Sequence, residues 1–185
     1  MNKYNVTGDE IVALLARSES DDMILDLFEK LEIDRSEIER DEDIDSFDID
    51  LEEEIGLVLT FDSSLEEKYC VPKYIGGNYL VQVTFDYYFK PLPYNLDDAY
   101  DLDAIVNVLN KEPNYININD ASRLYWFYED LGWFTIEFED ESLSSIYSVD
   151  VKPYENPLDA WESTKDEEGV SKRDGFSEII KPYKR

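Results

Sequence analysis

Histidine is absent from this chain of 185 residues, and cysteine occurs once, at Cys70. The lack of histidine excludes Ser-His-Asp and Cys-His nucleophilic systems and every metal site that histidine ligates. A single cysteine excludes an intrachain disulfide and a cysteine metal cluster. We interpret Cys70 as a small buried apolar residue, not as a reactive thiol.

Basic residues are scarce, because 17 Lys and Arg stand against 45 Asp and Glu, for a formal net charge of −28. Direct binding to nucleic acid needs Lys and Arg to displace counterions from the phosphates, so nucleic acid is not an expected partner. An anionic membrane surface would repel the chain for the same reason. A basic protein would be attracted rapidly and in a salt-dependent manner.

Long apolar runs are missing as well. No run approaches the roughly 18 residues that a membrane-spanning helix needs, and the start of the chain, MNKYNVTGDEIVALL, lacks the apolar core of a secretory signal. We therefore expect a cytoplasmic protein. The hydrophobic content of 43% and aromatic content of 14% are those of a folded chain.

Helices are predicted at the start and in the middle of the chain. Thr7 and Glu10 have the spacing of a capping box ahead of a helix. A second helix is predicted from Ser20, because the apolar residues that follow recur at helical spacing. A third, near residues 101–110, begins with a capping aspartate and is predicted to end at Pro113.

Strands are predicted where the apolar period changes to two. Apolar residues alternate with carboxylates over residues 47–52, as in a half-buried strand. Residues 55–61 and 79–87 are predicted as further strands, the second after a Gly-Gly-Asn turn. RLYWFYE, WFTIEFE and LSSIYSV, within residues 123–150, are predicted to form a three-stranded meander.

These elements predict an α+β fold. The sheet is antiparallel or mixed, ends in the meander, and has its helices mainly on one face. Residues 1–150 form one domain, with a helical pair at 1–35, an acidic loop at 36–46 and the sheet at 47–150. Residues 151–185 hold seven basic and eight acidic residues and several prolines and glycines, which indicates an extended arm or a partly ordered tail.

The stretch RDEDIDSFDIDLEEEIGL, residues 40–57, is the most acidic part of the chain. One interpretation is a calcium loop, since Asp41, Asp43, Asp45 and Glu52 occupy four ligand positions of an EF-hand. The match fails at Ser46, where the loop needs glycine for its sharp turn. A disordered tract is a second interpretation, but the regularly placed apolar residues favour an ordered segment from residue 47 onward.

A third interpretation is a surface dedicated to a partner. Residues 9–67 contain 23 acidic and four basic side chains, so most of the excess charge belongs to the first third of the chain. A solvated face that only aids solubility would explain the excess charge, but less well its concentration. The dedicated surface is therefore preferred.

Catalysis has little support. Glu137 and Glu139 beside Trp133 resemble the paired carboxylates of a glycosidase, but 45 carboxylates produce such pairs without any chemistry. Gly76-Gly77 indicates a turn and not a phosphate-binding loop. We expect a protein that is not an enzyme and that uses no cofactor and no metal.

Residues 54–149 resemble immunity proteins that bacteria encode beside the toxins of contact-dependent growth inhibition and other polymorphic toxin systems. The similarity lies in IGLVLTFD, GGNYLVQVTFDYY, KPLPYNLDDAYDLDAIVNVLNKEP and RLYWFYEDLGWFTIEFEDESLSSI. In related sequences, glycine follows the Pro-Leu-Pro region and ends the helix, where this chain has Asn95 and Asn110. Asparagine tolerates the left-handed backbone nearly as well as glycine.

The resemblance implies a protein that inhibits a toxin, as an antitoxin does. Such toxins are often nucleases with basic clefts, which acidic immunity proteins block. We therefore predict an acidic, cytoplasmic protein that binds a cognate basic nuclease toxin one-to-one through a protein–protein interaction. The alternatives are a DNA-mimic inhibitor of a host DNA-binding enzyme and a non-specific acidic soluble domain. The predicted partner-binding residues are Asp41, Glu42, Asp43, Asp45, Asp48, Asp50, Glu52, Glu53, Tyr87, Tyr88 and Trp133.

Overall fold

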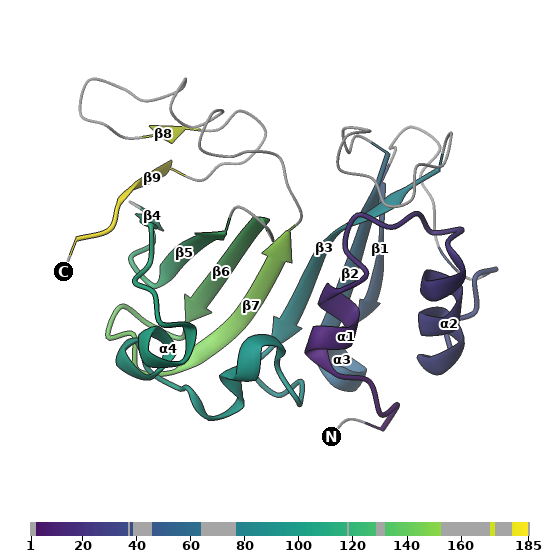
Figure 1. Ribbon diagram of the computed structural model, residues 1–185, viewed down its shortest axis with the longest axis horizontal. Helices are drawn as coiled ribbons and strands as arrows, with labels where there is room; N and C mark the ends of the chain where they lie inside the picture. Colours follow the sequence, from purple (N-terminus) through teal and green to yellow (C-terminus); the bar gives the residue numbers. More distant parts are fainter. Residues whose placement is uncertain are drawn as a thin grey trace.

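The computed structural model describes residues 3–36, 38, 46–63, 77–117, 119–128, 132–152, 171–172 and 179–184. Within them the fold is α+β, as the sequence predicts. One nine-stranded sheet runs in the order β1-β2-β3-β7-β6-β5-β4-β9-β8 (Figure 1). Every neighbouring pair of strands is antiparallel.

Side-chain caps fix the starts of the two N-terminal helices. The Thr7 hydroxyl of α1 (Gly8–Val12) accepts the Glu10 N–H at 3.1 Å, and the Glu10 carboxylate accepts the Thr7 N–H at 2.8 Å. The predicted capping box is thus confirmed. Helix α2 (Asp22–Lys30) begins two residues later than predicted, because Asp21 and not Ser20 caps it, accepting the Met23 N–H.

The middle helix, α4 (Leu102–Leu109), is capped by Asp101 as predicted, through the Ala104 N–H at 2.8 Å. It ends before Pro113, because Asn110 takes up the left-handed backbone with φ of 50°. A kinked 3₁₀ segment, η1 (Pro93–Asp98), precedes it and was not predicted. Within η1, Asn95 is also left-handed, with φ of 60°.

The first hairpin differs from the strand prediction at the start of its second strand. Strand β1 (Ser46–Leu51) is as expected, but β2 (Leu57–Asp62) begins two residues after the predicted Ile55. A short helix, α3 (Glu52–Ile55), lies between them and ends at Gly56, whose φ of 73° is left-handed. Consecutive glutamates favour helix, and glycine is the usual residue at such a helix end.

The remaining strands follow the prediction, with additions. Strand β3 (Tyr79–Asp86) and the meander of β5 (Arg123–Tyr128), β6 (Gly132–Phe138) and β7 (Ile146–Lys152) are all present. Strand β4 (Tyr115–Asn117) was not predicted. Strands β8 (Ser171–Lys172) and β9 (Ile179–Pro182), from the predicted arm, extend the sheet by pairing β9 with β4. The described sheet therefore ends in β1 on one side and β8 on the other.

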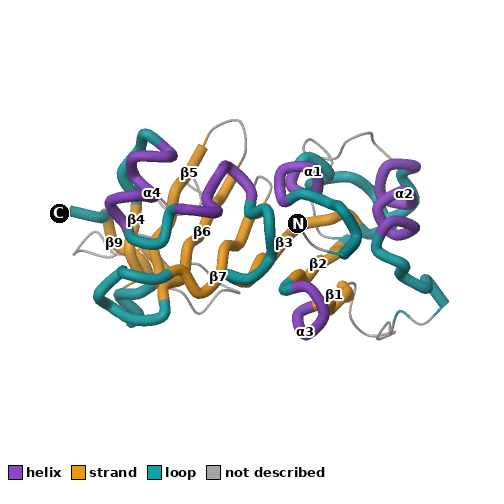
Figure 2. The backbone as a smooth tube through the Cα atoms, turned by 90° about the horizontal axis from the view of Figure 1, so that it is seen from below, coloured by secondary structure: helices purple, strands orange, loops and turns teal. Residues whose placement is uncertain are grey.

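Helices α1, α2 and α4 lie on one face of the sheet, and α3 lies beside β1 and β2 on the other side (Figure 2). The core forms between these helices and the strands. Phe61 stacks on Phe47 at a centroid distance of 5.0 Å and meets Phe28 of α2 edge-on at 5.7 Å. These ring contacts hold α2 over the β1–β2 hairpin and so position the acidic edge of the sheet.

Candidate functional site

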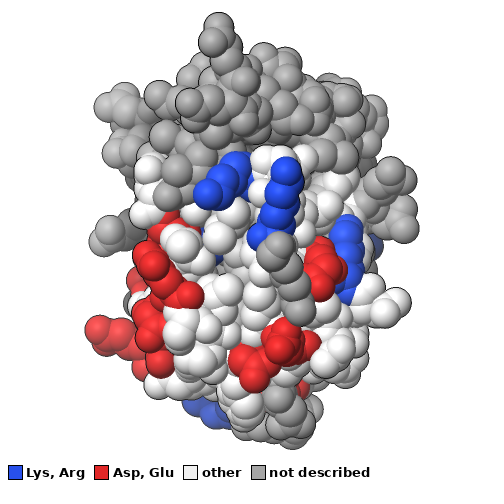
Figure 3. Space-filling model, turned by 90° about the vertical axis from the view of Figure 1, so that its left-hand side faces the viewer, with Lys and Arg blue, Asp and Glu red and all other residues white. Residues whose placement is uncertain are grey.

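The negative charge of the described residues is concentrated at the β1 end of the sheet. Residues 3–36 and 46–63 contain 15 Asp or Glu and four Lys or Arg. The described residues from 101 onward contain nine Asp or Glu and six Lys or Arg. The end of the molecule that carries α4 and β9 shows Lys or Arg side chains beside carboxylates (Figure 3). The excess charge is therefore not spread evenly over the described molecule.

Strand β1 presents its carboxylates to solvent because its side chains alternate between two faces. Phe47 and Ile49 are buried, with 6% and 7% of their surface exposed, while Asp48 and Asp50 are exposed. Three further exposed carboxylates, from residues 52–54, follow on α3. The period-two pattern of the sequence thus gives a row of carboxylates along the strand.

Two backbone contacts hold α3 in place at the end of β1. The Asp50 carboxylate accepts the Glu52 N–H at 2.8 Å, and the Gly56 N–H donates to the Glu52 carbonyl oxygen at 2.8 Å. The Tyr88 hydroxyl donates to the same carbonyl oxygen. The side chains of Glu52 and Glu53 take no part in these contacts and remain exposed.

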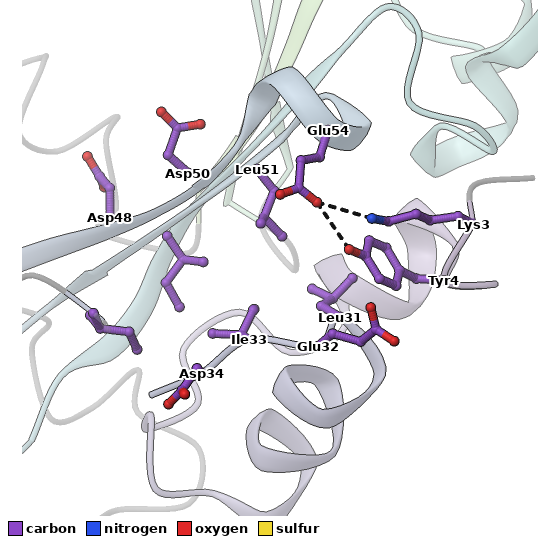
Figure 4. Close-up of a pocket in the computed structure, with 12 residues that line it drawn as sticks. Lys3, Tyr4, Leu31, Glu32, Ile33, Asp34, Asp48, Asp50, Leu51 and Glu54 are labelled. Atoms are coloured by element: carbon purple, nitrogen blue, oxygen red, sulfur yellow. Dashed lines mark hydrogen bonds and ion pairs between the residues drawn. The ribbon is translucent and has the colours of Figure 1, made fainter. Parts of the chain in front are cut away.

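A groove of about 590 Å³ lies between β1 and the segment that follows α2 (Figure 4). One wall is formed by residues 48–51 of β1, and the other by residues 31–34 and Ile38. Asp48 and Asp50 project from β1 away from the opposite wall (Figure 4). The apolar lining residues are Leu31, Ile33, Ile38, Ile49 and Leu51, and the acidic ones are Glu32, Asp34, Asp48, Asp50 and Glu54.

One end of the groove is closed by contacts to Glu54. The Lys3 ammonium lies 3.2 Å from its carboxylate, and the Tyr4 hydroxyl donates to the same oxygen at 3.1 Å (Figure 4). The hydrogen bond from Lys3, and to a smaller extent the one from Tyr4, lowers the pKa of the Glu54 carboxyl. Lys3 is the one basic side chain in the lining, so the described groove keeps a strong excess of negative charge.

Two exposed tyrosines follow strand β3, and the second of them contacts α3. Tyr87 and Tyr88 have 53% and 43% of their surface exposed, and their rings meet edge-on at a centroid distance of 5.4 Å. Asp86 lies directly before them. Burial, and secondarily the nearby Asp50 carboxylate, raise the pKa of the Asp86 carboxyl. Aromatic surface thus adjoins the carboxylate row.

The structure brings together four of the predicted carboxylates, Asp48, Asp50, Glu52 and Glu53, and places Tyr88 against α3. Tyr87 is exposed beside Tyr88. The other predictions lie outside the described residues: Asp41, Glu42, Asp43, Asp45 and the side chain of Trp133. Of Trp133 only the backbone is described, in β6, opposite Phe127 of β5.

Sequence reasoning missed the second wall of the groove. The helical spacing of apolar residues predicts Leu31 as the last of a helical stripe and gives no role to Ile33, whereas α2 stops at Lys30 and Glu32 takes up a left-handed backbone with φ of 58°. The chain then runs past β1. No local pattern in the sequence indicates this approach, because it depends on contacts between distant segments.

A second polar cluster lies on strands β3, β5, β6 and β7. The Thr84 hydroxyl donates to the Asp150 carboxylate at 2.5 Å, and Arg123 forms an ion pair with Glu137. Burial raises the pKa of the Asp150 carboxyl. Of the carboxylates considered for a glycosidase, Glu137 is held by Arg123, and Glu139 is exposed beyond the end of β6. These contacts join polar side chains on neighbouring strands, so the cluster is explained by its role within the sheet.

Over the described ranges, no group of three or more Asp, Glu, Cys or His side chains is placed to hold a metal ion. No helix in the same part of the chain combines the length and apolar character needed to cross a bilayer. Comparison with known proteins gave no match to a family model, to a curated protein or to a solved structure.

Proposed function

We propose that this chain is a cytoplasmic, acidic binding protein that neutralises a cognate basic protein by forming a tight one-to-one complex. The partner class that fits best is a nuclease toxin with a basic phosphate-binding cleft. The observation that carries the proposal is the exposed carboxylate row of Asp48, Asp50, Glu52 and Glu53. Within the described residues, none of these carboxylates forms an ion pair with Lys or Arg.

The mechanism would be attraction followed by occlusion, without chemistry. A concentrated negative potential steers a basic partner toward the β1 end and raises the association rate. Short-range affinity needs apolar contact as well, and interface hot spots favour aromatic residues. The exposed ring of Tyr88, which contacts α3, and the ring of Tyr87 against it supply such surface. A cleft covered in this way can no longer admit nucleic acid.

The resemblance to immunity proteins supports the same proposal. Asn95 and Asn110 stand where related sequences have glycine, and both have positive φ, 60° and 50°. The backbone at these two positions therefore has the left-handed conformation that glycine adopts most easily. A DNA mimic is less well supported, because it should carry rows of carboxylates over most of its length, and the described charge falls off toward α4 and β9.

Co-purification with the product of the neighbouring gene tests the proposal. The tagged chain should retain that product at an ionic strength of about 0.05 M, and high salt should slow association without abolishing the complex. Added in equimolar amount, the chain should abolish the partner's nuclease activity. Failure to retain any basic partner at low salt would overturn the proposal.

A further inference from the structure

The outer edge of β1 has backbone groups that no other described strand uses. The Asp86 N–H of β3 donates to the Gly56 carbonyl oxygen at 2.9 Å, so this carbonyl points toward β3 and the Leu57 N–H, on the opposite side of the same planar peptide, points toward β1. This direction alternates along a strand, so the residues of β2 that pair with Ile49 and Leu51 face β1. It follows that Asp48 and Asp50 direct their N–H and C=O groups away from β2. Among the described residues, no strand pairs with this edge.

The groove runs along this edge and not over one face of the strand. Successive side chains of a strand point to opposite faces, yet the four successive residues 48–51 all line the groove. Asp48 and Asp50 point their side chains away from the facing wall, so a space beside the backbone accounts for four lining residues in a row (Figure 4). The groove therefore meets the outward N–H and C=O groups of Asp48 and Asp50.

We infer that the groove receives an extended segment of the basic partner, which adds to the sheet as an antiparallel strand beside β1. The inference rests on the proposed function and specifies how the partner is held. Added strands gain affinity from main-chain hydrogen bonds and specificity from alternate side chains. The antiparallel direction is that of every other pair in the sheet.

The alternation along β1 determines the sequence of the occupant. In antiparallel pairing, directly opposed residues place their side chains on the same face. Residues opposite Asp48 and Asp50 therefore lie beside two exposed carboxylates and should be Lys or Arg. The residues between them point to the face of Ile49 and toward Leu31 and Ile33 of the facing wall, and should be apolar. The occupant is a segment in which basic and apolar residues alternate.

A second copy of this chain does not fit the same edge. Two β1 strands paired edge to edge in antiparallel would set Asp48 and Asp50 of one copy against the same residues of the other. Directly opposed like charges destabilise a strand pair, and charged side chains are a common protection of edge strands against such pairing. The charge of the groove therefore selects a basic strand over self-association.

Synthetic peptides test the inference without the natural partner. The probe is a peptide of about ten residues in which lysine alternates with valine, a length that spans an ordinary strand. Two matched versions carry N-methyl groups, one on the lysine amides and the other on the valine amides. In the inferred pairing the lysine amides face β1, so lysine methylation should weaken binding at least tenfold, and valine methylation should change it less than threefold.

Hydrogen exchange gives an independent readout on the protein. The plain peptide should slow exchange at the amides of Asp48 and Asp50 at least tenfold, while those of Ile49 and Leu51, already bonded to β2, should change little. No binding, any other ranking of the methylated peptides, or unchanged exchange at the two outward amides overturns strand addition. Binding without these signatures would be attraction by charge alone, which leaves the proposed function standing.

Two substitutions of one residue separate the backbone from the charge. Asp48→Asn removes a carboxylate and keeps the outward N–H, whereas Asp48→Pro removes both. Because this N–H takes no part in the β1–β2 ladder, proline is tolerated there as on other edge strands. We expect Asp48→Pro to bind the plain peptide at least fivefold more weakly than Asp48→Asn, with the same thermal unfolding midpoint. Equal affinities in two folded variants would overturn the inference.

Discussion

Removing two charges from the carboxylate row should slow association with the partner and leave folding intact. The variant is Asp48→Asn combined with Glu52→Gln. Both side chains are exposed, and within the described residues neither accepts an ion pair. Asp50 is kept, because its carboxylate accepts the Glu52 N–H at the start of α3.

The size of the effect follows from Coulomb's law. A unit charge on the partner about 10 Å from each carboxylate gains about 0.4 kcal/mol per carboxylate in water. Loss of both costs about 0.8 kcal/mol without screening and about 0.6 kcal/mol at an ionic strength of about 0.01 M, where the Debye length is about 30 Å, which is about a threefold lower association rate. At about 0.15 M the Debye length is about 8 Å, so the same loss shrinks to about one and a half-fold.

Stability should change in the opposite direction or not at all. Neighbouring carboxylates of one sign repel one another, and surface substitutions away from special contacts alter stability by less than about 0.5 kcal/mol. The Glu52 backbone contacts do not involve its side chain, so α3 should persist. We therefore expect the unfolding midpoint of the double variant to be equal to that of the unaltered protein, or slightly higher.

Stopped-flow mixing with the co-purified partner at several salt concentrations measures the rate, and thermal unfolding measures stability. A matched control is Glu139→Gln with Glu141→Gln, which also removes two exposed carboxylates but lies in the turn between β6 and β7. The control should keep the original rate. Equal slowing by both variants would show that net charge alone matters, and a stability loss above about 1 kcal/mol would show a structural role for the row; either result refutes the reasoning.

Three further predictions concern the scaffold. Gly56→Ala should destabilise the protein by at least about 1 kcal/mol in denaturant unfolding, because φ is 73° and the added Cβ would lie 2.9 Å from the Tyr88 ring. Asp101→Ala should cost about 1 kcal/mol in the same assay, and Asp101→Asn should restore most of it, because the cap accepts the Ala104 N–H. Asp150→Asn should become increasingly more stable than the unaltered protein as the pH rises from about 4, the ordinary pKa of an aspartate, through the raised pKa of the folded state. Burial raises the pKa of that carboxyl, so its favourable contribution is present below the unfolded pKa and is lost as pH rises through the folded pKa. A constant difference across this range would contradict the last prediction.

Local signals in the sequence were sufficient for most elements. Thr7 and Asp101 cap helices as their spacing predicts, because a capping contact spans only three residues of chain. The alternation over residues 47–51 likewise predicted which face of β1 is exposed to solvent, because successive side chains of a pleated strand point to opposite faces. These are the features that a short window of sequence determines.

The groove could not be predicted in this way. Its two walls, residues 48–51 and residues 31–34 with Ile38, meet only because aromatic contacts place α2 over the hairpin. Helix α3 was missed because its four residues make only about one helical turn, in which no apolar residue can recur at helical spacing. Strands β4, β8 and β9 were missed because two to four residues carry too little alternation to distinguish a strand from a loop.

The two ends of the sheet are protected in different ways, and the difference bears on function. Strand β8 is two residues long and offers almost no ladder to another chain, which is a usual protection for an edge. Strand β1 is six residues long, so its length alone would invite pairing, and its protection is the charge of Asp48 and Asp50. A very short edge strand prevents pairing with any other strand, whereas a negatively charged edge strand prevents pairing only with strands that are not basic. An edge kept open in this selective way is suited to receiving one kind of partner, and that is why we place the contact with the basic protein at β1.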